Sequence, residues 1–417
     1  MEQTIIIVGA GVAGLYAARE LSKAGYKIII TEADKRVGGR IHTLSHGNFN
    51  QNVESGAEFV HGKLPITLKL LREADIEYVR VEGEMYQVKN GNWKRQVEMA
   101  PHWDELMEKL QELQQDMTIA DFLQQYFSEP KYKELRESVQ RFAEGFDVAD
   151  ITKASMLAVR EEWQADMEDT FRVTGGYGQL VDYLKNQCLA GGCELHTSFV
   201  VQEIAWKKDA VVATAASGQK IKGNKAIITI PVGLMQTGSI RFSPSIDRYT
   251  EAAKQIGYGS VIKILFQFKE AFWNEFADDI GFIFGEEIVP TWWTQLPDKY
   301  PLLTGWFGGQ QVMRVKGATE EEISVIALQS LADTTSKDIN HLQQLLISQE
   351  VHHWSNNPFA CGAYSYSTLQ TKEARKVFRE PVDNTLYFAG EGYNETGSSA
   401  TVEAALASAT QTLKIIG

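Results

Sequence analysis

The chain is poor in cysteine, and its few cysteines follow no pattern of a metal site or a disulfide framework. They are Cys188, Cys193 and Cys361. Their number is odd and no Cys-x-x-Cys pair occurs, which excludes a disulfide-stabilised scaffold and provides no metal-ligand spacing. We therefore expect no bound metal and a reducing, cytoplasmic location.

Long hydrophobic runs are also missing. The longest apolar stretches have the length of a strand, whereas a membrane-spanning helix needs about 20 apolar residues. The first predicted strand begins almost at the first residue, which leaves no room for a signal peptide. The sequence thus predicts no association with a membrane.

Positive charge is in deficit. Lysine and arginine number 41 against 54 aspartates and glutamates, which gives a formal net charge of −13. Such a chain would repel nucleic-acid phosphates, so no nucleic-acid partner is expected. An acidic surface can attract polycations, although many soluble proteins are acidic without any such role.

What the chain does have is a nucleotide-binding pattern in its first forty residues. A strand is predicted over 4–8, a helix over 15–24 and a second strand over 27–31. The turn between the first strand and the helix reads Gly-Ala-Gly-Val-Ala-Gly over 9–14. This order is typical of a βαβ unit that binds a dinucleotide, with the pyrophosphate at the helix N-terminus. Glu32, at the end of the second strand, can accept hydrogen bonds from a ribose diol and would repel the 2′-phosphate of NADP.

A chain of 417 residues is too long for one typical core, and its character alternates along the sequence. Segments 1–62, 172–245 and 380–417 are expected to form one domain, because they carry the strand–helix pattern. The blocks 63–171 and 246–379 form a second domain, with mostly amphipathic helices in the first block. The predicted fold class is α/β: a Rossmann-type dinucleotide-binding domain interleaved with an α+β substrate-binding domain, with the active site between them.

Hydrophobic periodicity predicts further elements in these segments. The predicted strands are 200–205, 210–215, 225–230, 261–268, 281–284 and 385–389. The predicted helices are 103–115, 179–190, 320–332 and 401–415.

Four segments in order resemble the flavin-containing amine oxidase family, which includes polyamine and monoamine oxidases. They are the opening unit up to Arg40, the stretch 259–273 around Lys263, the stretch 354–366, and the closing stretch 386–405. Together they span nearly the whole chain. The resemblance implies an FAD-binding first domain and an activity on amines.

The resemblance places FAD along the opening and closing segments. The glycines of the turn would lie at the pyrophosphate, Glu32 at the adenosine ribose, and Val201 at the adenine. Ala363 stands where monoamine oxidases attach FAD through cysteine, so the FAD is expected to be non-covalent. The cofactor-binding residues that the resemblance implies are Gly9, Gly11, Ala13, Gly14, Glu32, Ala33, Arg36, Gly39, Arg40, Gly56, Ala57, Glu58, Val201, Gly390, Glu391, Thr401 and Val402.

Lys263 is the catalytic residue that the resemblance implies, holding a water near flavin N5. By strand alternation it shares a face with Val261 and Leu265. Alternation alone leaves two options open, a lysine buried with these apolar neighbours or one that faces solvent on a half-buried sheet.

Four residues are expected at the substrate. Tyr364 resembles one wall of the aromatic cage before the flavin, whereas Thr401 replaces the second tyrosine of monoamine oxidases. Trp354 would pack near the flavin, unless it is an ordinary core aromatic. His61 matches a histidine that contacts a substrate nitrogen in polyamine oxidases, the alternative being a local backbone bond.

Other substrate signals are weaker. L-Amino-acid oxidases of the family carry an arginine near the position of Lys63, which offers a charge but no bidentate grip on a carboxylate. Aromatic residues of the second half can line a substrate tunnel or form ordinary core: Trp292, Trp293, Trp306, Phe307 and Tyr366.

The expected function is FAD-dependent oxidation of a polyamine-like amine to an imine, which water hydrolyses to an aldehyde. Dioxygen is the expected acceptor and hydrogen peroxide the product. The alternatives are a monoamine or L-amino-acid oxidase and, in another class, a non-catalytic carrier like the Rab dissociation inhibitors. Histone demethylation is not expected, because the sequence has no additional N-terminal domain or long helical insertion.

Overall fold

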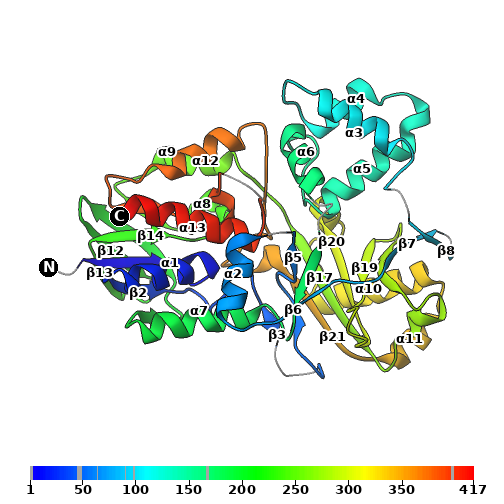
Figure 1. Ribbon diagram of the computed structural model, residues 1–417, viewed down its shortest axis with the longest axis horizontal. Coiled ribbons are helices and arrows are strands. Elements are labelled where there is room, and N and C mark those ends of the chain that lie inside the picture. Colours follow the sequence, from blue (N-terminus) through cyan, green and yellow to red (C-terminus); the bar gives the residue numbers. More distant parts are fainter. Residues whose placement is uncertain are drawn as a thin grey trace.

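The computed structural model describes residues 3–44, 49–62, 64–89, 91–96, 99–165, 169–395 and 399–417. Figure 1 shows two lobes side by side, with both chain ends in the first lobe and a cap of helices above the second. The first lobe is built on a parallel sheet, the second on a larger mixed sheet.

The first lobe contains a five-stranded parallel sheet whose strands come from distant parts of the chain. Its order is β10-β2-β1-β14-β23, and every neighbouring pair is parallel. The strands are β10 (Glu194–His196), β2 (Lys27–Thr31), β1 (Thr4–Val8), β14 (Lys225–Ile228) and β23 (Leu386–Phe388). The strands predicted at 4–8 and 27–31 have these bounds, whereas those predicted at 225–230 and 385–389 are shorter.

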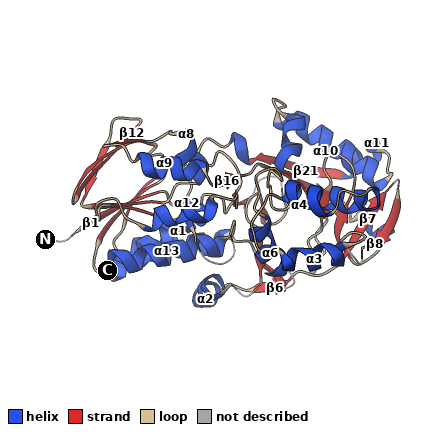
Figure 2. Cartoon of the chain, turned by 90° about the horizontal axis from the view of Figure 1, so that it is seen from above, coloured by secondary structure: helices blue, strands red, loops and turns tan. Residues whose placement is uncertain are grey.

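Both faces of this sheet are covered, as its continuous apolar strands require. Side chains of β1 alternate between two cores: Ile5 and Ile7 pack beneath the helices, and Ile6 and Val8 pack against a second sheet. Figure 2 shows this layering. The helices are α1 (Val12–Lys23), α7 (Gly178–Ala190) and α13 (Val402–Ile416); the second sheet has the order β13 (Lys220–Gly223), β12 (Ala210–Ala215), β11 (Val201–Lys207) and β15 (Arg241–Ser243).

The second lobe is built on a seven-stranded sheet. Strand β17 is buried at all eight of its positions because β20 and β21 pair with its two edges and core packs on its faces. The order is β21 (Leu346–His353), β17 (Val261–Phe268), β20 (Leu302–Gly308), β19 (Thr291–Trp293), β18 (Ile280–Phe284), β7 (Glu84–Lys89) and β8 (Asn92–Arg95). Helices α10 (Glu320–Thr335) and α11 (Ile339–Leu345) belong to the same lobe.

Segment 63–171 is less helical than the sequence suggested. It contributes β7 and β8 to the large sheet, and β6 (Tyr78–Arg80) and β9 (Thr170–Val173) to a three-stranded sheet with β5 (Phe59–His61). Its helices are α2 (Pro65–Glu73) and the cap of α3 (Trp103–Glu112), α4 (Ile119–Tyr126), α5 (Lys133–Gly145) and α6 (Met156–Ala165). Helix α3 ends at Glu112, about one turn before the end of the amphipathic helix predicted over 103–115.

Short elements complete the described chain. They are β3 (Thr43–Leu44), β4 (Val53–Glu54), β16 (Gly257–Tyr258), β22 (Ser365–Tyr366), α8 (Val232–Thr237), α9 (Asp247–Lys254) and α12 (Thr371–Arg379), besides short 3-10 helices. Within the described ranges, no helix is both long and apolar enough to cross a bilayer.

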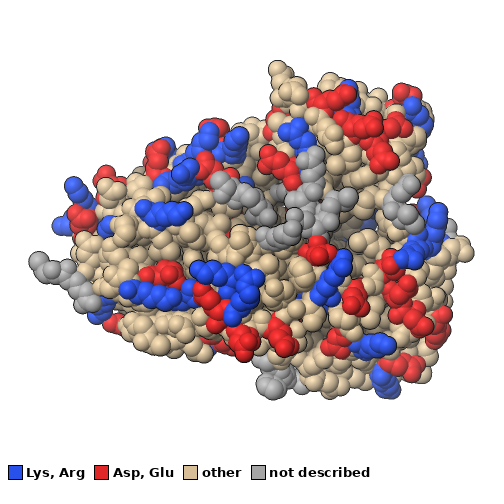
Figure 3. All heavy atoms as spheres, viewed as in Figure 1, with Lys and Arg blue, Asp and Glu red and all other residues tan. Residues whose placement is uncertain are grey.

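Charges of both signs share the surface. On the face seen in Figure 3, lysine and arginine are interspersed with aspartate and glutamate, and acidic side chains are frequent over the helical cap. Helix α3 alone carries Asp104, Glu105, Glu108 and Glu112. The cap therefore presents negative charge above the second lobe.

Candidate active site

A cavity of about 2170 Å³ lies between the two lobes. Its walls run from Gly11 and Glu32 on the parallel sheet to Lys263 and Trp306 on the large sheet. Every site residue predicted from the sequence lines this cavity except Gly14, which lies beneath it. Lys63 lies outside the described residues.

The nucleotide end of the cavity is formed by the turn between β1 and α1. Gly11 is the N-cap of α1 and lines the cavity, so the N-terminus of the helix, with its unpaired N–H groups and partial positive charge, lies at the cavity. The first turn of the helix carries no acidic side chain that would neutralise this charge. A Cβ on Gly11 would meet no atom within 4 Å. A Cβ on Gly14 would lie 2.1 Å from the carbonyl oxygen of Gly9, so the helix packs here only with glycine.

Glu32 lies at the end of β2, as the nucleotide-binding pattern predicts. Its Oε2 accepts a hydrogen bond from the backbone N–H of Ala10 at 2.7 Å, and its Oε1 accepts one from Asp34 at 2.9 Å. Burial raises the pKa of Glu32, and these two N–H donors only partly offset the effect. The carboxylate is thus fixed beside the turn.

Two arginines act differently. Arg36 donates to the carbonyl oxygens of Val37, Gly39 and Ile41 and so folds its own loop. Arg40 instead crosses the chain, donating to Glu391 Oε1 at 2.6 Å and to the carbonyl oxygen of Ala363 at 2.8 Å.

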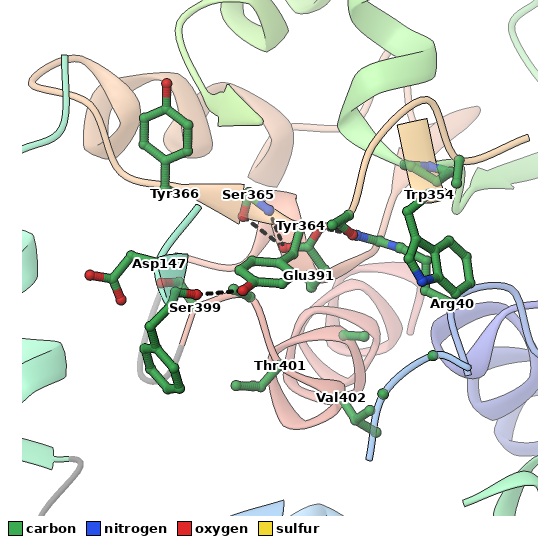
Figure 4. Close-up of a pocket in the computed structure, with 18 of the residues that line it drawn as sticks. Arg40, Asp147, Trp354, Tyr364, Ser365, Tyr366, Glu391, Ser399, Thr401 and Val402 are labelled. Carbon is green, nitrogen blue, oxygen red and sulfur yellow. Dashed lines mark hydrogen bonds and ion pairs between the residues drawn. The ribbon is translucent and has the colours of Figure 1, made fainter. Parts of the chain in front are cut away.

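Glu391 joins these segments. Its Oε2 accepts a hydrogen bond from Ser365 Oγ at 2.6 Å, and Figure 4 shows Arg40 and Ser365 both reaching this carboxylate. Thr401 caps helix α13, its Oγ1 accepting from Ala404 N–H at 3.1 Å, and Val402 begins the helix. The closing motif therefore presents a second helix N-terminus to the cavity.

Lys263 is buried, which excludes the solvent-facing option. Its side chain is 1% exposed and its Nζ donates to Glu58 Oε2 at 2.7 Å and to the carbonyl oxygen of Gly56 at 3.1 Å. Burial alone would raise the pKa of Glu58, but Lys263 and Arg172 outweigh it and hold that pKa below its usual range. Glu58 was predicted at the cofactor; its carboxylate is engaged with these two cations.

Aromatic side chains form the wall opposite the nucleotide turn. The rings of Trp306 and Tyr364 lie 6.4 Å apart and nearly parallel. Both are held at the C-terminal end of α5. Trp306 Nε1 donates to the carbonyl oxygen of Gly145 at 2.8 Å, and Tyr364 Oη donates to the carbonyl oxygen of Phe146, the C-cap of this helix. Trp354 is buried beside them, donating to the carbonyl oxygen of Ser55 at 3.0 Å.

The other aromatic candidates divide by strand alternation. Trp293, Trp306 and Tyr366 line the cavity, whereas Trp292 and Phe307 belong to the core of the large sheet. The sequence could not separate these groups, because each tryptophan of the 292–293 pair faces a different side of its strand.

His61 lies in the wall near the cap. Its Nδ1 is 3.3 Å from Thr170 Oγ1, and among the described residues its ring makes no hydrogen bond to the backbone, the alternative considered. Its ring packs edge-on against Phe146, with centroids 6.0 Å apart. Burial lowers the pKa of His61 to about 4, so the imidazole is neutral at neutral pH.

Sequence reasoning missed the cavity-lining carboxylate Asp147. It is buried, accepts a hydrogen bond from Trp163 Nε1 at 3.2 Å, and lies beyond Tyr364 and Ser399 in Figure 4. Nothing in the motif around it distinguishes Asp147 from an ordinary surface aspartate.

Glu54 is a buried acid behind Lys263. Its Oε1 accepts from Thr43 Oγ1 and from the backbone N–H of Tyr177, but its Oε2 has no hydrogen-bond partner within the described chain. Burial raises the pKa of Glu54 from 4.5 to about 7. The folded protein therefore holds a proton that the unfolded chain releases between these values.

As pH rises from about 4.5 to about 7, Glu54 should consequently lower the free energy of unfolding by about 3 kcal/mol, against the opposite contribution of histidines such as His61, whose pKa burial lowers. We expect Glu54→Gln to remove this contribution, so that the variant gains stability relative to the unmodified protein at pH 8 but not at pH 5. Urea unfolding at both pH values measures this. Glu77→Gln, at an exposed site, is the control; equal pH dependence in all three proteins would contradict the prediction.

A Rossmann-type domain that shares an elongated cavity with a substrate lobe is the arrangement of a dinucleotide-dependent oxidoreductase. The sequence model of a family described as flavin containing amine oxidoreductase matches residues 12–412. The chain belongs to this family and is a flavin-dependent amine oxidoreductase.

Individual relatives are distant. The chain is 24% identical to Polyamine oxidase 2 of Arabidopsis thaliana over 93% of its own length and 83% of the relative's. It is 25% identical to Lysine-specific histone demethylase 2 of Homo sapiens, of which it covers 51%. The fold is that of putrescine oxidase, seen bound to putrescine (TM-score 0.83, 20% identity, 100% and 99% coverage), and of cyclohexylamine oxidase from Brevibacterium oxydans (TM-score 0.83, 18% identity, the same coverage).

Proposed function

We propose that this protein oxidises a diamine or polyamine with a non-covalently bound FAD and dioxygen. The observation that carries the proposal is the placement of Lys263. This buried ammonium lines the same cavity as the helix N-terminus at Gly11, with an aromatic wall beside it. The relatives named polyamine oxidase and the fold neighbour bound to putrescine support the choice of substrate class.

The residues present fit FAD. Glu32 would hold the adenosine ribose, and the open space at Gly11 would admit the pyrophosphate against the N-terminus of α1. The backbone at Thr401 and Val402 would face the flavin at the second helix N-terminus. Bound FAD supplies a two-electron acceptor for the carbon next to the amine nitrogen.

Ala363, which offers no thiol at the position where monoamine oxidases attach FAD through cysteine, supports non-covalent binding. The thiol of Cys361, two residues away, contacts the carbonyl oxygen of Pro358 at 3.6 Å. We expect acid precipitation of the purified protein to release all of the flavin into the supernatant, and Cys361→Ser to release it equally. Flavin retained in the pellet would contradict this prediction.

The protein's own groups would then bind and orient the amine. The Trp306–Tyr364 wall positions the substrate, and its apolar surface favours the neutral amine that must lose a hydride. The amine loses a hydride from carbon and a proton from nitrogen, in total two electrons and two protons, and becomes an imine, which water hydrolyses to an aldehyde and the remaining amine or ammonia. Dioxygen takes up the two electrons and two protons as hydrogen peroxide.

Two groups near the cap suit a second nitrogen. Neutral His61 can accept a hydrogen bond from an ammonium group, and Asp147 supplies negative charge in the same cavity. The acidic face of the cap would attract a cationic substrate toward the cavity. A simple monoamine uses neither group.

The proposal is tested by colour and by peroxide. The purified protein should be yellow and should bleach under nitrogen when a productive amine is added. A panel of putrescine, spermidine, spermine, benzylamine, tyramine and several L-amino acids should give peroxide fastest with the first three. A colourless protein that binds prenylated proteins would instead indicate a carrier, and fastest turnover of a monoamine or an amino acid would replace the substrate class.

His61→Ala should separate diamines from monoamines. Loss of the neutral acceptor should lower kcat/KM for the best diamine or polyamine by about tenfold, the effect of one lost charge-assisted hydrogen bond, and change that for benzylamine much less. His341→Ala, exposed on α11, is the control. Equal losses for both substrate types would remove His61 from the argument for a second nitrogen.

A further inference from the structure

Lys263 does not stand alone at the junction of the lobes. Glu58, which immediately precedes β5, lies between Lys263 and Arg172 of β9. Its Oε2 accepts from Lys263, and its Oε1 accepts from Arg172 Nε at 3.1 Å, from Arg172 Nη2 at 3.0 Å and from Trp293 Nε1 at 3.0 Å. The carboxylate is therefore shared by two cations and fixed by an indole.

Arg172 is itself held by the backbone. It donates to the carbonyl oxygens of Thr294, Gln295 and Leu296, in addition to its two bonds to Glu58. These five bonds match the five N–H groups of a guanidinium, so its orientation is fixed. The loop after β19 thus determines where the Glu58 carboxylate lies.

Within the described chain, the hydrogen bonds that Lys263 donates leave one N–H group of its ammonium free to point into the cavity. An ammonium has three N–H groups, of which two donate to Glu58 and Gly56. Among the described residues no other acceptor is bonded to Nζ, and Lys263 lines the cavity. The centroid of the Trp293 ring lies 5.5 Å from Nζ, and Trp293 also lines the cavity.

We propose that Glu58 and Arg172 are positioning residues for Lys263: Glu58 keeps its amine charged and aims the third N–H into the cavity, and Arg172 fixes Glu58. Without the carboxylate, the desolvated ammonium would face a second cation, and loss of its proton would relieve both penalties. This inference rests on the proposed function for its catalytic meaning, but the charge state of Lys263 can be tested without it.

Amine-selective labelling tests the charge state directly. Formaldehyde with cyanoborohydride modifies neutral amines and is small enough to enter the cavity. We expect Lys263 to resist labelling at pH 8 in the unmodified protein, with and without FAD, and to be labelled at least tenfold faster in Glu58→Gln, as read by peptide mass spectrometry. Lys225, which lies outside the cavity, should label equally in both proteins.

A milder variant guards against misfolding. Trp293→Phe removes the indole donor to Glu58 but keeps the carboxylate and a smaller aromatic ring beside Lys263, so Lys263 should be labelled faster than in the unmodified protein but by a smaller factor than in Glu58→Gln. Labelling of Lys263 at the unmodified rate in either folded variant would overturn the proposal. If a variant has a lower melting temperature but unchanged labelling, then Lys263, Glu58 and Arg172 only stabilise the contact between the lobes, and Glu58 does not control the charge of Lys263.

The catalytic consequence is read from a pH profile. Reoxidation of the reduced protein by dioxygen should lose rate at a pH at least one unit lower in Glu58→Gln than in the unmodified protein. Glu54 of β4 and His352 of β21 also face Lys263, so the comparison is repeated in the Glu54→Gln background; burial keeps the pKa of His352 at about 4, below the range measured. Shifted labelling with an unshifted profile would overturn the catalytic meaning, and a protein that never binds FAD would overturn the proposed function while the labelling result stands.

Discussion

Replacement of Lys263 by methionine is expected to leave FAD bound and to slow flavin reduction or reoxidation by more than about tenfold, within the range of lost proton-transfer and positioning groups. Methionine fills a similar volume but cannot donate a hydrogen bond into the cavity. Glu58 stays paired with Arg172, so the variant should still fold. Stopped-flow absorbance of the bound flavin, with anaerobic amine and then with dioxygen, measures the two half-reactions.

Lys225→Met is the matched control, because Lys225 is also a strand lysine, partly buried, but donates a hydrogen bond to Tyr387 Oη at 3.2 Å on the other sheet. It should leave both half-reactions unchanged. If Lys263→Met retains the rates of the unmodified protein, Lys263 is a structural residue whose charge serves only Glu58. Loss of flavin from Lys263→Met would instead give it a binding role.

Two alanine substitutions in the nucleotide turn should differ in their effect on the flavin-free protein, because only one of them meets a steric clash. In Gly14→Ala the new methyl group would overlap the carbonyl oxygen of Gly9, 2.1 Å away, and would lie 2.9 Å from Thr229 Oγ1. Helix α1 must then move from the sheet, which should cost at least about 2 kcal/mol of unfolding free energy and abolish tight FAD binding.

Gly11→Ala should leave the flavin-free protein as stable as before. The backbone of Gly11 has φ −72°, which alanine adopts freely, and its Cβ would meet no protein atom within 4 Å. The methyl group would instead occupy space assigned to the pyrophosphate, so FAD affinity should fall by at least about tenfold, or about 1.4 kcal/mol. Thermal unfolding measures the stability of the flavin-free protein, and flavin titration measures its affinity for FAD. Undiminished FAD affinity in Gly11→Ala would show that the pyrophosphate does not bind at Gly11.

The parts of the site that could be predicted are those that depend on residues close together in the sequence. The turn 9–14 and Glu32 indicate a nucleotide site because the spacing of the glycines and of the acidic residue within one strand–helix–strand unit is sufficient to recognise it. The burial of Lys263 could not be derived this way, since alternation only groups it with Val261 and Leu265. The structure decides the question through the pairing of β17 with β20 and β21.

The parts that were missed depend on contacts between distant residues. Arg172 reaches Glu58 because β9 pairs with β5, with Phe59 opposite Arg172. The strand Glu84–Lys89 mixes polar and apolar residues without helical or strict strand periodicity, and only pairing with β18 makes it part of the large sheet. No local pattern encodes either contact.

The strand order of the first lobe also bears on how the protein is made. β14 lies between β1 and β23, which come from opposite ends of the chain, and α13 packs against α1. Thr401 and Val402 then supply one wall of the cavity. During synthesis the nucleotide turn emerges from the ribosome well before helix α13, which supplies this part of the cavity wall. The nascent chain therefore cannot form the complete flavin pocket until helix α13 has been synthesised.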